Sequence, residues 1–448
     1  MRANSVVMVC GLMVAAACGD DSKVQPDAAR PPDAPAVDAP VSPLTPEEIA
    51  AIHLQSPLLA PPADPTNAYA DSAKAVALGQ MLFFDKSYAG ALAIGDDGTN
   101  GGLGMPGDTG KVSCASCHAA GSDGMDDRRS RPNNVSLGTD YGTRNALAAI
   151  NSAFSTWTNW GGRFDSQWSL PLAVAENAKI MKSSRLQIAH LLYTKYRTEY
   201  DATFPVALDS RLADTTTFAA TGKPGDAAFD GLSTADKDII NRIFANYGKA
   251  IAAYLRTLVS RDAPFDRFVA GDETAISASA VRGIKVFLAK GCVGCHSGPA
   301  FTDNQFHALV VPQSGTHVPT TDLGRYADVP PLLASPFNTS GAYSDNTTTG
   351  KLTGLAQDPA QQGQFRTKSL RNVALTAPYM HAGQLATLDD VVAFYDQGGG
   401  DAGSSGIVKD ARMVPLGLSV QERADLVAFL ETLSGEPVAA GALVDTSK

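Results

Sequence analysis

A five-residue pattern, C-x-x-C-H, occurs twice and constrains this chain more than any other feature. The first copy spans Cys114–His118 and the second spans Cys292–His296. In this spacing, two thiols can bond to the two vinyl groups of one haem, and the adjacent histidine can then ligate the iron. A lone C-x-x-C could instead be half of a zinc site or a redox pair. Two complete copies predict two covalently bound haem c groups.

The cysteine and histidine inventory agrees with two haems. The chain has 448 residues and six cysteines. Apart from Cys10 and Cys18 near the N-terminus, every cysteine belongs to a motif, so none remains for a structural disulfide. The expected haem-attachment residues are Cys114, Cys117, His118, Cys292, Cys295 and His296.

Residues 1–18 have the features of a bacterial export signal. Arg2 supplies a positive charge, Val6–Ala17 is apolar, and small residues precede Cys18. A cysteine in this place is typical of lipoproteins, although Ala15 stands where leucine is usual, and plain secretion is the alternative. We expect a periplasmic or cell-envelope protein that is anchored through a lipid on Cys18. Membrane contact is expected only through that lipid.

A segment rich in Asp, Ala and Pro follows the signal. Residues 19–45 show no apolar periodicity, and this composition buries too little surface to offset ordering, so we expect a tether. Thr45, Pro46 and Glu48 form a helix start at which the folded region begins. Outside the N-terminus, no apolar run reaches the length of a membrane span.

The charge of the chain excludes one class of partner. The formal net charge is −10, and no stretch is strongly basic, so we predict that the protein does not bind nucleic acid. An acidic surface would suit a basic electron-donor protein, but it is equally ordinary for a secreted protein.

A weak internal repeat indicates two related domains. Gly79 and Phe83 precede the first motif, and Gly283 and Phe287 precede the second. In each pair a glycine and an aromatic residue four positions later share one face of an amphipathic helix. The predicted fold is all-α, with two cytochrome c-like haem domains in tandem and long loops. Their expected ranges are 46–270 and 271–438.

Several signals mark the expected helices and loops. Residues 234–259 have a helical pattern, a further helix is expected from Ser277 to a glycine cap at Gly291, and Ser419 with Glu422 forms a capping box. We interpret the glycine-rich stretch 88–111 as a surface insertion.

All three tryptophans lie in one short aromatic stretch. Such a stretch is normally core, but one indole could instead carry electrons between two haems. Its members are Phe154, Trp157, Trp160, Phe164 and Trp168.

The order of these motifs resembles that of the bacterial di-haem cytochrome c peroxidases and of their relative MauG, the maturation enzyme of methylamine dehydrogenase. The resemblance spans roughly 73–435. Besides the two haem motifs it is carried by Leu78–Asp85, Arg144-Asn145, Trp160–Arg163, Pro264–Asp266 and Leu370–Gly383.

The resemblance implies roles for particular residues. The haem at Cys114–His118 would be the peroxidatic site, and the haem at Cys292–His296 would pass electrons to it. Trp160 matches the tryptophan that lies between the haems in the family. Calcium between the domains would be held by Asn145, Thr376 and Pro378, which offer the oxygen ligands this cation prefers.

The chain departs from the peroxidase pattern around both haems. Leu137 stands near the place of a histidine that closes the peroxidatic haem in many members. Leu170 and Ile180 fall where the family has a distal glutamine and glutamate. Glu176, one helical turn before Ile180, could replace the missing carboxylate or could be structural.

The electron-transfer haem also differs. Tyr395 replaces the methionine ligand, as in MauG, and is our expected iron ligand, with Met380 and Met413 as alternatives. A phenolate stabilises ferric iron over ferrous iron, whereas a methionine sulfur raises the potential.

These features predict an exported di-haem peroxidase-like oxidoreductase, with Trp160 and Glu176 as the candidate catalytic residues. It would reduce hydrogen peroxide at the first haem with electrons from a small donor protein relayed by the second. The alternatives are MauG-like oxidation of a partner protein and a non-catalytic two-haem electron carrier. The prediction also allows a homodimer.

Overall fold

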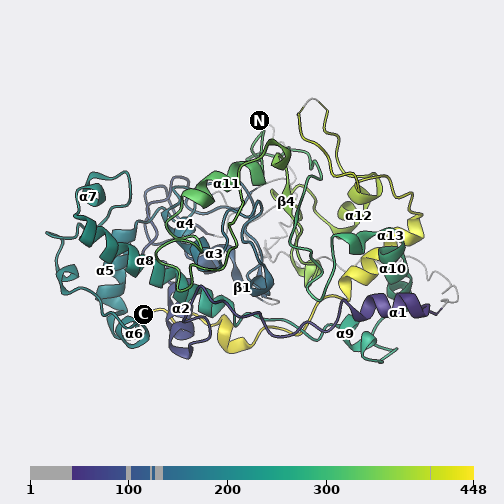
Figure 1. Ribbon diagram of the computed structural model, residues 1–448, viewed down its shortest axis with the longest axis horizontal. Coiled ribbons are helices and arrows are strands. Elements are labelled where there is room, and N and C mark those ends of the chain that lie inside the picture. Colours follow the sequence, from purple (N-terminus) through teal and green to yellow (C-terminus); the bar gives the residue numbers. More distant parts are fainter. Residues whose placement is uncertain (1–42, 97–101, 122–123, 127–134, 404) are drawn as a thin grey trace, which may run out of the picture. The chain divides into compact units, whose positions relative to one another are not determined.

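The computed structural model describes residues 43–96, 102–121, 124–126, 135–403 and 405–448 (Figure 1). These residues belong to one compact unit, Asp38–Lys448. The expected signal, Cys18 and all but the end of the expected tether fall outside the described residues. Among the described residues, no helix combines the length and the apolar character needed to cross a membrane.

Helices joined by long loops dominate the described chain, which agrees with the mostly helical fold predicted from the sequence. Short antiparallel pairs, β1 with β2 and β3 with β4, are the sheet structure it shows. The α-helices are α1 (Pro46–His53), α2 (Ala73–Phe84), α3 (Cys114–Cys117), α4 (Ser169–Glu176), α5 (Arg185–Lys195), α6 (Arg197–Thr203), α7 (Ala227–Asp230), α8 (Thr234–Leu255), α9 (Pro264–Val269), α10 (Ala278–Ala289), α11 (Arg325–Ala334), α12 (Leu388–Asp396) and α13 (Val420–Glu431). The strands are β1 (Ala119–Gly121), β2 (Gly124–Asp126), β3 (Phe306–His307) and β4 (Phe365–Arg366), and the 3₁₀ helices are η1 (Ser152–Phe154), η2 (Ser210–Ala213), η3 (Cys292–Gly294), η4 (Pro359–Gln361), η5 (Val373–Leu375) and η6 (Ala440–Leu443).

The structure confirms the helix start and end signals that the sequence predicted. Thr45 and Glu48 form a capping box at α1, and Ser419 and Glu422 form another at α13. Each box satisfies backbone N–H groups that the first turn of a helix leaves unpaired. Gly291 follows α10 in the left-handed conformation, with φ 78°, which glycine adopts without a steric penalty.

The internal repeat has a physical basis in two helix pairs, α2 with α8 and α10 with α13. A Cβ atom at Gly79 of α2 would overlap the carbonyl oxygen of Ala250 in α8. A Cβ atom at Gly283 of α10 would likewise overlap the carbonyl oxygen of Asp425 in α13. The absence of a side chain therefore lets each motif-bearing half bring two helix backbones into direct contact.

Two large hydrophobic clusters and a small third one form the core of the described chain, and the two large ones do not separate at residue 270. The first cluster is built around α2, α5 and α8, and the second around α10, α12 and α13. Ile52 of α1 and Phe265 of α9 pack in the second cluster, whereas Phe337 and Val438 pack in the first. This packing departs from the expected ranges 46–270 and 271–438, because chain segments from each range cross into the other core.

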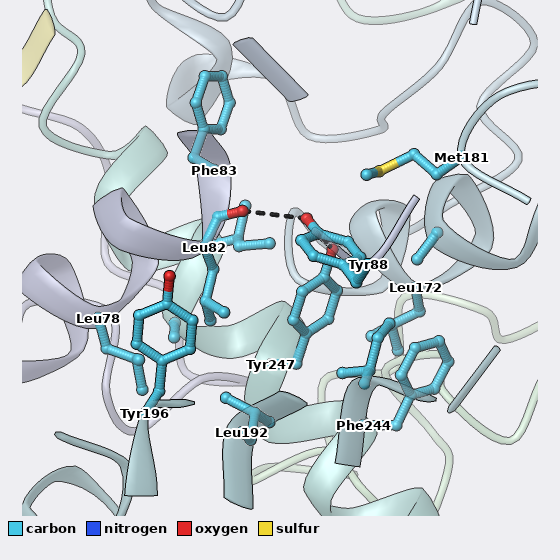
Figure 2. Packing of buried hydrophobic residues seen from close by; sticks show 14 of the residues in the cluster. Leu78, Leu82, Phe83, Tyr88, Leu172, Met181, Leu192, Tyr196, Phe244 and Tyr247 are labelled. Atoms are coloured by element: carbon cyan, nitrogen blue, oxygen red, sulfur yellow. Dashed lines mark hydrogen bonds between the residues drawn. The ribbon is translucent and has the colours of Figure 1, made fainter. Parts of the chain in front are cut away.

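The stretch after α2 is not the plain surface insertion expected from its composition. Tyr88, Leu92 and Leu103 are buried in the first cluster. The Tyr88 hydroxyl donates a hydrogen bond to the carbonyl of Leu82 and lies 3.0 Å from the hydroxyl of Tyr247 (Figure 2). These three buried side chains therefore anchor the stretch to the first cluster, although many glycines lie around them in the sequence.

Candidate active site

A cavity of about 1100 Å³ is lined by residues of both C-x-x-C-H motifs. All six expected attachment residues face it: Cys114, Cys117, His118, Cys292, Cys295 and His296. Pockets for one small molecule occupy roughly 300–1,000 Å³, so this cavity exceeds the usual size of a site for a single ligand. The fold thus brings together two motifs that are far apart in the sequence.

The first motif follows a short turn of helix against α2. Cys114 and Cys117 lie at the two ends of α3, and the backbone N–H of His118 donates to the carbonyl of Cys114 at 2.9 Å. The ring of Phe83 from α2 lies 6.2 Å from the ring of His118. The aromatic residue of the internal repeat therefore packs beside the expected iron ligand.

The second motif offers its histidine in the form that a metal ligand needs. The Nδ1 atom of His296 lies 3.1 Å from the carbonyl oxygen of Phe301. A ring nitrogen that donates to a carbonyl fixes the tautomer and leaves Nε2 as a metal ligand. None of the four motif cysteines forms a disulfide in the part of the chain that the structure describes. Thiols outside any disulfide, this histidine and the size of the cavity fit covalent haem c at both motifs.

Trp160 lines the same cavity and is held from several sides. Its Nε1 donates to the carbonyl of Asn145 at 2.7 Å, and the Lys368 ammonium nitrogen lies 4.5 Å from its ring centre. The ring of His381 lies 6.3 Å away in an edge-to-face arrangement. Burial, with the nearby Arg366 and Arg144, holds the pKa of Lys368 well below its usual range.

The other two tryptophans have different surroundings. Trp168 is fully buried in the first cluster and donates to the hydroxyl of Thr66. Trp157 lies between two cations, with Arg325 4.5 Å and Lys351 4.8 Å from its ring. The three tryptophans of this stretch therefore have three different environments. Trp160 lines the cavity, whereas Trp157 and Trp168 are not among its lining residues.

The residues expected to bind calcium also face this cavity. Asn145, Thr376 and Pro378 all line it, and the Asn145 backbone N–H donates to the carbonyl of His381 at 2.8 Å. Both polar atoms of the Asn145 side chain are buried, and neither has a hydrogen-bond partner among the described residues. A buried amide without a partner is costly, so this geometry leaves an oxygen available for a missing ligand such as a cation.

What faces the cavity differs between its two ends. Leu170 and Ile180 line it, and at the first motif the carbonyl of Leu137 accepts a hydrogen bond from the Cys117 thiol. Tyr395 lines it near Cys292 and Cys295, and burial raises the pKa of its phenol. Met380 and Met413, the alternative iron ligands, line the cavity as well.

Comparison with known proteins identifies the family. A family model described as di-haem cytochrome c peroxidase matches residues 73–274. Cytochrome-c peroxidase IdrP2 of Denitromonas iodatirespirans is 34% identical over 377 residues, which cover 83% of this chain and 84% of that protein. The chain belongs to the di-haem cytochrome c peroxidase family.

Other members of this peroxidase family, and solved structures, agree. Methylamine utilization protein MauG of Methylorubrum extorquens is 30% identical over 81% of this chain and 79% of that protein. A crystal structure of a MauG-like protein associated with microbial copper homeostasis has a TM-score of 0.56 at 25% identity and covers 87% of this chain and 97% of that one. The diheme peroxidase BthA from Burkholderia thailandensis, with a TM-score of 0.57 at 19% identity over 85% of this chain and 91% of that one, shares the fold.

Membership of the di-haem peroxidase family establishes an oxidoreductase with two haem c cofactors and confirms the resemblance read from the motifs.

The geometry around Glu176 does not support its predicted catalytic role. Arg185 donates through Nε and Nη2 to the two carboxylate oxygens of Glu176, each at 2.9 Å, and its backbone N–H adds a third bond. Glu176 is not among the residues lining the cavity. The geometry corrects the catalytic candidate at Glu176, whose carboxylate ties the end of α4 to the start of α5.

Two ion-pair groups beside the peroxidase cavity were missed by sequence reasoning. Arg144 donates to Asp322 and to Asp328 at 2.6–2.7 Å, and Arg371 pairs with Asp266 in the second core. Arg144 and Arg371 both belong to motifs that carry the resemblance. Asp266 also belongs to such a motif, but Asp322 and Asp328 gave no signal, since they lie in a loop and a short helix without a motif.

Proposed function

We propose that this protein reduces hydrogen peroxide at the haem held by Cys114, Cys117 and His118. Electrons would arrive through the haem held by Cys292, Cys295 and His296. The observation that carries the proposal is the cavity shared by both motifs, with Trp160 in its wall. When bound, the first haem supplies an iron for cleavage of the O–O bond, and the second supplies an electron store.

The protein residues set the conditions for this chemistry. His118 and His296 would ligate the two irons, and Trp160, fixed by its bond to the Asn145 carbonyl, is the side chain we assign to electron relay. Leu170 and Ile180 exclude water but have no proton to give or take. Positioned proton transfer typically contributes about 10²–10⁴-fold. Turnover should therefore be slower by about that factor than in members with a distal acid and base.

A second candidate function is oxidation of a partner protein, the reaction type of MauG. It is favoured by Tyr395, since a phenolate ligand would make the second haem a reservoir of oxidising equivalents. The non-catalytic carrier is the third reading, supported by the apolar side chains beside the first motif. Hydrogen peroxide and a small electron-donor or substrate protein are the partners we propose.

One experiment separates these functions. Reduced holoprotein is mixed with one equivalent of peroxide in a stopped-flow spectrometer while both haem bands are followed. A peroxidase oxidises both haems and converts peroxide to water. If neither haem band responds, the non-catalytic electron carrier is the function that remains. A long-lived oxidised state that decays only when a partner protein is added would favour the MauG-like reaction.

We also propose a calcium ion held by Asn145, Thr376 and Pro378. The buried Asn145 amide, which has no partner among the described residues, supports it. Calcium should be detected by elemental analysis of protein purified without chelator, and Asn145→Ala should lose it. Equal calcium content in the wild type and the variant would contradict the site.

For location we propose the periplasm or cell envelope, with a lipid on Cys18. Wild type should then appear in the membrane fraction and be released by detergent. Anchoring that survives fractionation needs more than one acyl chain. Cys18→Ser should be soluble. Identical fractionation of the two would refute the anchor.

A further inference from the structure

A chain of aromatic rings leads from the first haem motif to the protein surface, away from Trp160. It begins at Tyr88, which belongs to the hydrophobic cluster against which Cys114 packs. The Tyr88 and Tyr247 hydroxyls lie 3.0 Å apart, and their ring centres are separated by 5.8 Å (Figure 2). Both side chains are about 1% exposed, so this contact lies in dry protein.

The chain continues along α8 and ends at a carboxylate. Phe244, one turn before Tyr247, stacks on it with ring centres 6.0 Å apart and planes 6° from parallel. Phe337 lies 5.8 Å from Phe244 and 5.1 Å from Tyr343. The Tyr343 hydroxyl donates to a carboxylate oxygen of Asp238 at 3.1 Å, and the Asp238 side chain is 49% exposed.

The two ends of this chain differ in what can accept a proton. A phenol that loses an electron becomes strongly acidic and is stable as a radical only if its proton can move to a base. Tyr88 has a backbone carbonyl as its acceptor, which is a very weak base. Tyr343 has the carboxylate of Asp238, whose other oxygen is paired with Arg242. Of the two phenols, Tyr343 is therefore the one with a base to which a radical could pass its proton.

We infer that Tyr88, Tyr247 and Tyr343 form a relay that ends in a second oxidation site, at which small one-electron donors react, with hydroquinone as the probe. This rests on the proposed peroxide chemistry, because peroxide is the oxidant. Phe244 and Phe337 are bridges in the relay, since phenylalanine has no phenol to oxidise.

The electrons and protons balance as follows. Reduction of one peroxide to two waters takes two electrons and two protons, and the relay supplies one or both electrons toward the haem at Cys114. For each electron, Tyr343 loses its phenolic proton to Asp238 and becomes a neutral radical. A hydroquinone molecule then gives one electron to the radical, the proton returns from Asp238 to the phenolate oxygen, and the hydroquinone becomes a semiquinone after losing its own proton to water.

The test uses full-length protein with both haems, mixed with peroxide in the absence of a donor and freeze-quenched for electron paramagnetic resonance. Wild type should give a neutral tyrosyl radical that hydroquinone removes. Tyr343→Phe should lose the radical although its haem bands still respond to peroxide. Asp238→Asn, which keeps the size but removes the base, should lower the radical yield with the same haem response.

Tyr200→Phe is the matched control, since Tyr200 is also buried and bonded through its hydroxyl, to Asn246, but is outside the relay. It should keep the radical. A radical that survives Tyr343→Phe overturns the relay. So does one lost only in Tyr196→Phe, because the Tyr196 hydroxyl donates to another carboxylate, Asp85. Haem bands that respond without any tyrosyl radical refute the relay alone, whereas unresponsive haem bands refute the proposed function with it.

Discussion

The two haem-binding regions are built on the same scaffold but present different side chains to the cavity. In each, a helix with a glycine lies directly on the backbone of a later helix, Gly79 on α8 and Gly283 on α13. In each, an aromatic residue four positions after the glycine is buried next to the motif. The backbone arrangement thus repeats, as a repeat in sequence would require.

The difference lies in the residues beyond each motif. Leu170 and Ile180 line the cavity with apolar side chains, whereas Tyr395, near Cys292 and Cys295, offers a ligand atom. Under the proposed function, the iron with apolar neighbours would keep a position open for substrate, and the iron with a sixth ligand would be restricted to electron transfer. The comparison teaches how one scaffold could serve two functions through the few side chains that differ between the two regions.

Removing the two thiols of either motif should have the largest effect, because one of the two haem regions then loses its haem. We expect Cys114→Ala with Cys117→Ala, and separately Cys292→Ala with Cys295→Ala, to lose one haem each by intact-mass measurement. The first pair should abolish reaction with peroxide, because its haem is the one with an open position. Cys18→Ser is the control and should keep both haems. Two haems in either double variant would contradict covalent attachment at that motif.

Adding a carboxylate beside the first motif tests its apolar character. Ile180→Glu should raise peroxide turnover, with an upper limit of about 10²–10⁴-fold for positioned proton transfer. Ile180→Gln matches its size without a titrating group and should give little gain. Glu176→Gln should leave turnover unchanged, because that carboxylate is paired with Arg185. Fast wild-type turnover that no variant alters would mean that Ile180 does not face the haem.

Exchanging the expected ligand near the second motif should make it resemble an ordinary electron-transfer haem. Axial ligands set haem potentials over roughly 0.8 V, so Tyr395→Met should raise the second potential by a substantial part of that range. A redox titration of both haems measures the shift, and the first haem serves as an internal control. A near-infrared thioether-to-iron band that persists in Tyr395→Phe would assign the ligand to Met380 or Met413 instead.

Filling the two glycine contacts should give the smallest effects and show whether the scaffolds are equivalent. Gly79→Ala and Gly283→Ala each place a methyl group against backbone, which typically costs about 1–3 kcal/mol. The free energy of unfolding, from denaturant titration of the holoprotein, should fall in both. Gly441→Ala, where a Cβ meets nothing within 4 Å, is the control. A loss confined to one of the two variants would show that the halves are not packed alike.

Local chemistry could be predicted from the sequence, and distant partners could not. The haem residues follow from a pattern of five consecutive residues, and the caps at Thr45 and Ser419 follow from signals within one helical turn. Both therefore depend only on residues that are close together in the sequence. Glu176 was placed wrongly as a catalytic candidate because its partner Arg185 lies beyond a break between two helices. Nothing in its own helix indicates that pairing.

The packing of segments from each half in the core of the other could not be predicted, for the same physical reason. α1 and α9 are amphipathic helices, and their sequences show which face is apolar but not which core will bury it. The burial of Tyr88 depends on contacts with α2 and α8 that form only in the folded chain. The link between Asn145 and His381 joins two motifs whose contact was expected only through the resemblance, which implied a shared calcium ion.

The glycine contacts also set an order of assembly. Each joins helices that are separated by well over a hundred residues, and the entropy of closing such long loops makes distant contacts form slowly. The first motif lies inside the loop that α2 and α8 close. We therefore expect its thiols to stay accessible while the chain is still open, so that haem attachment precedes closure and the attached ring then becomes the surface on which the helices fold.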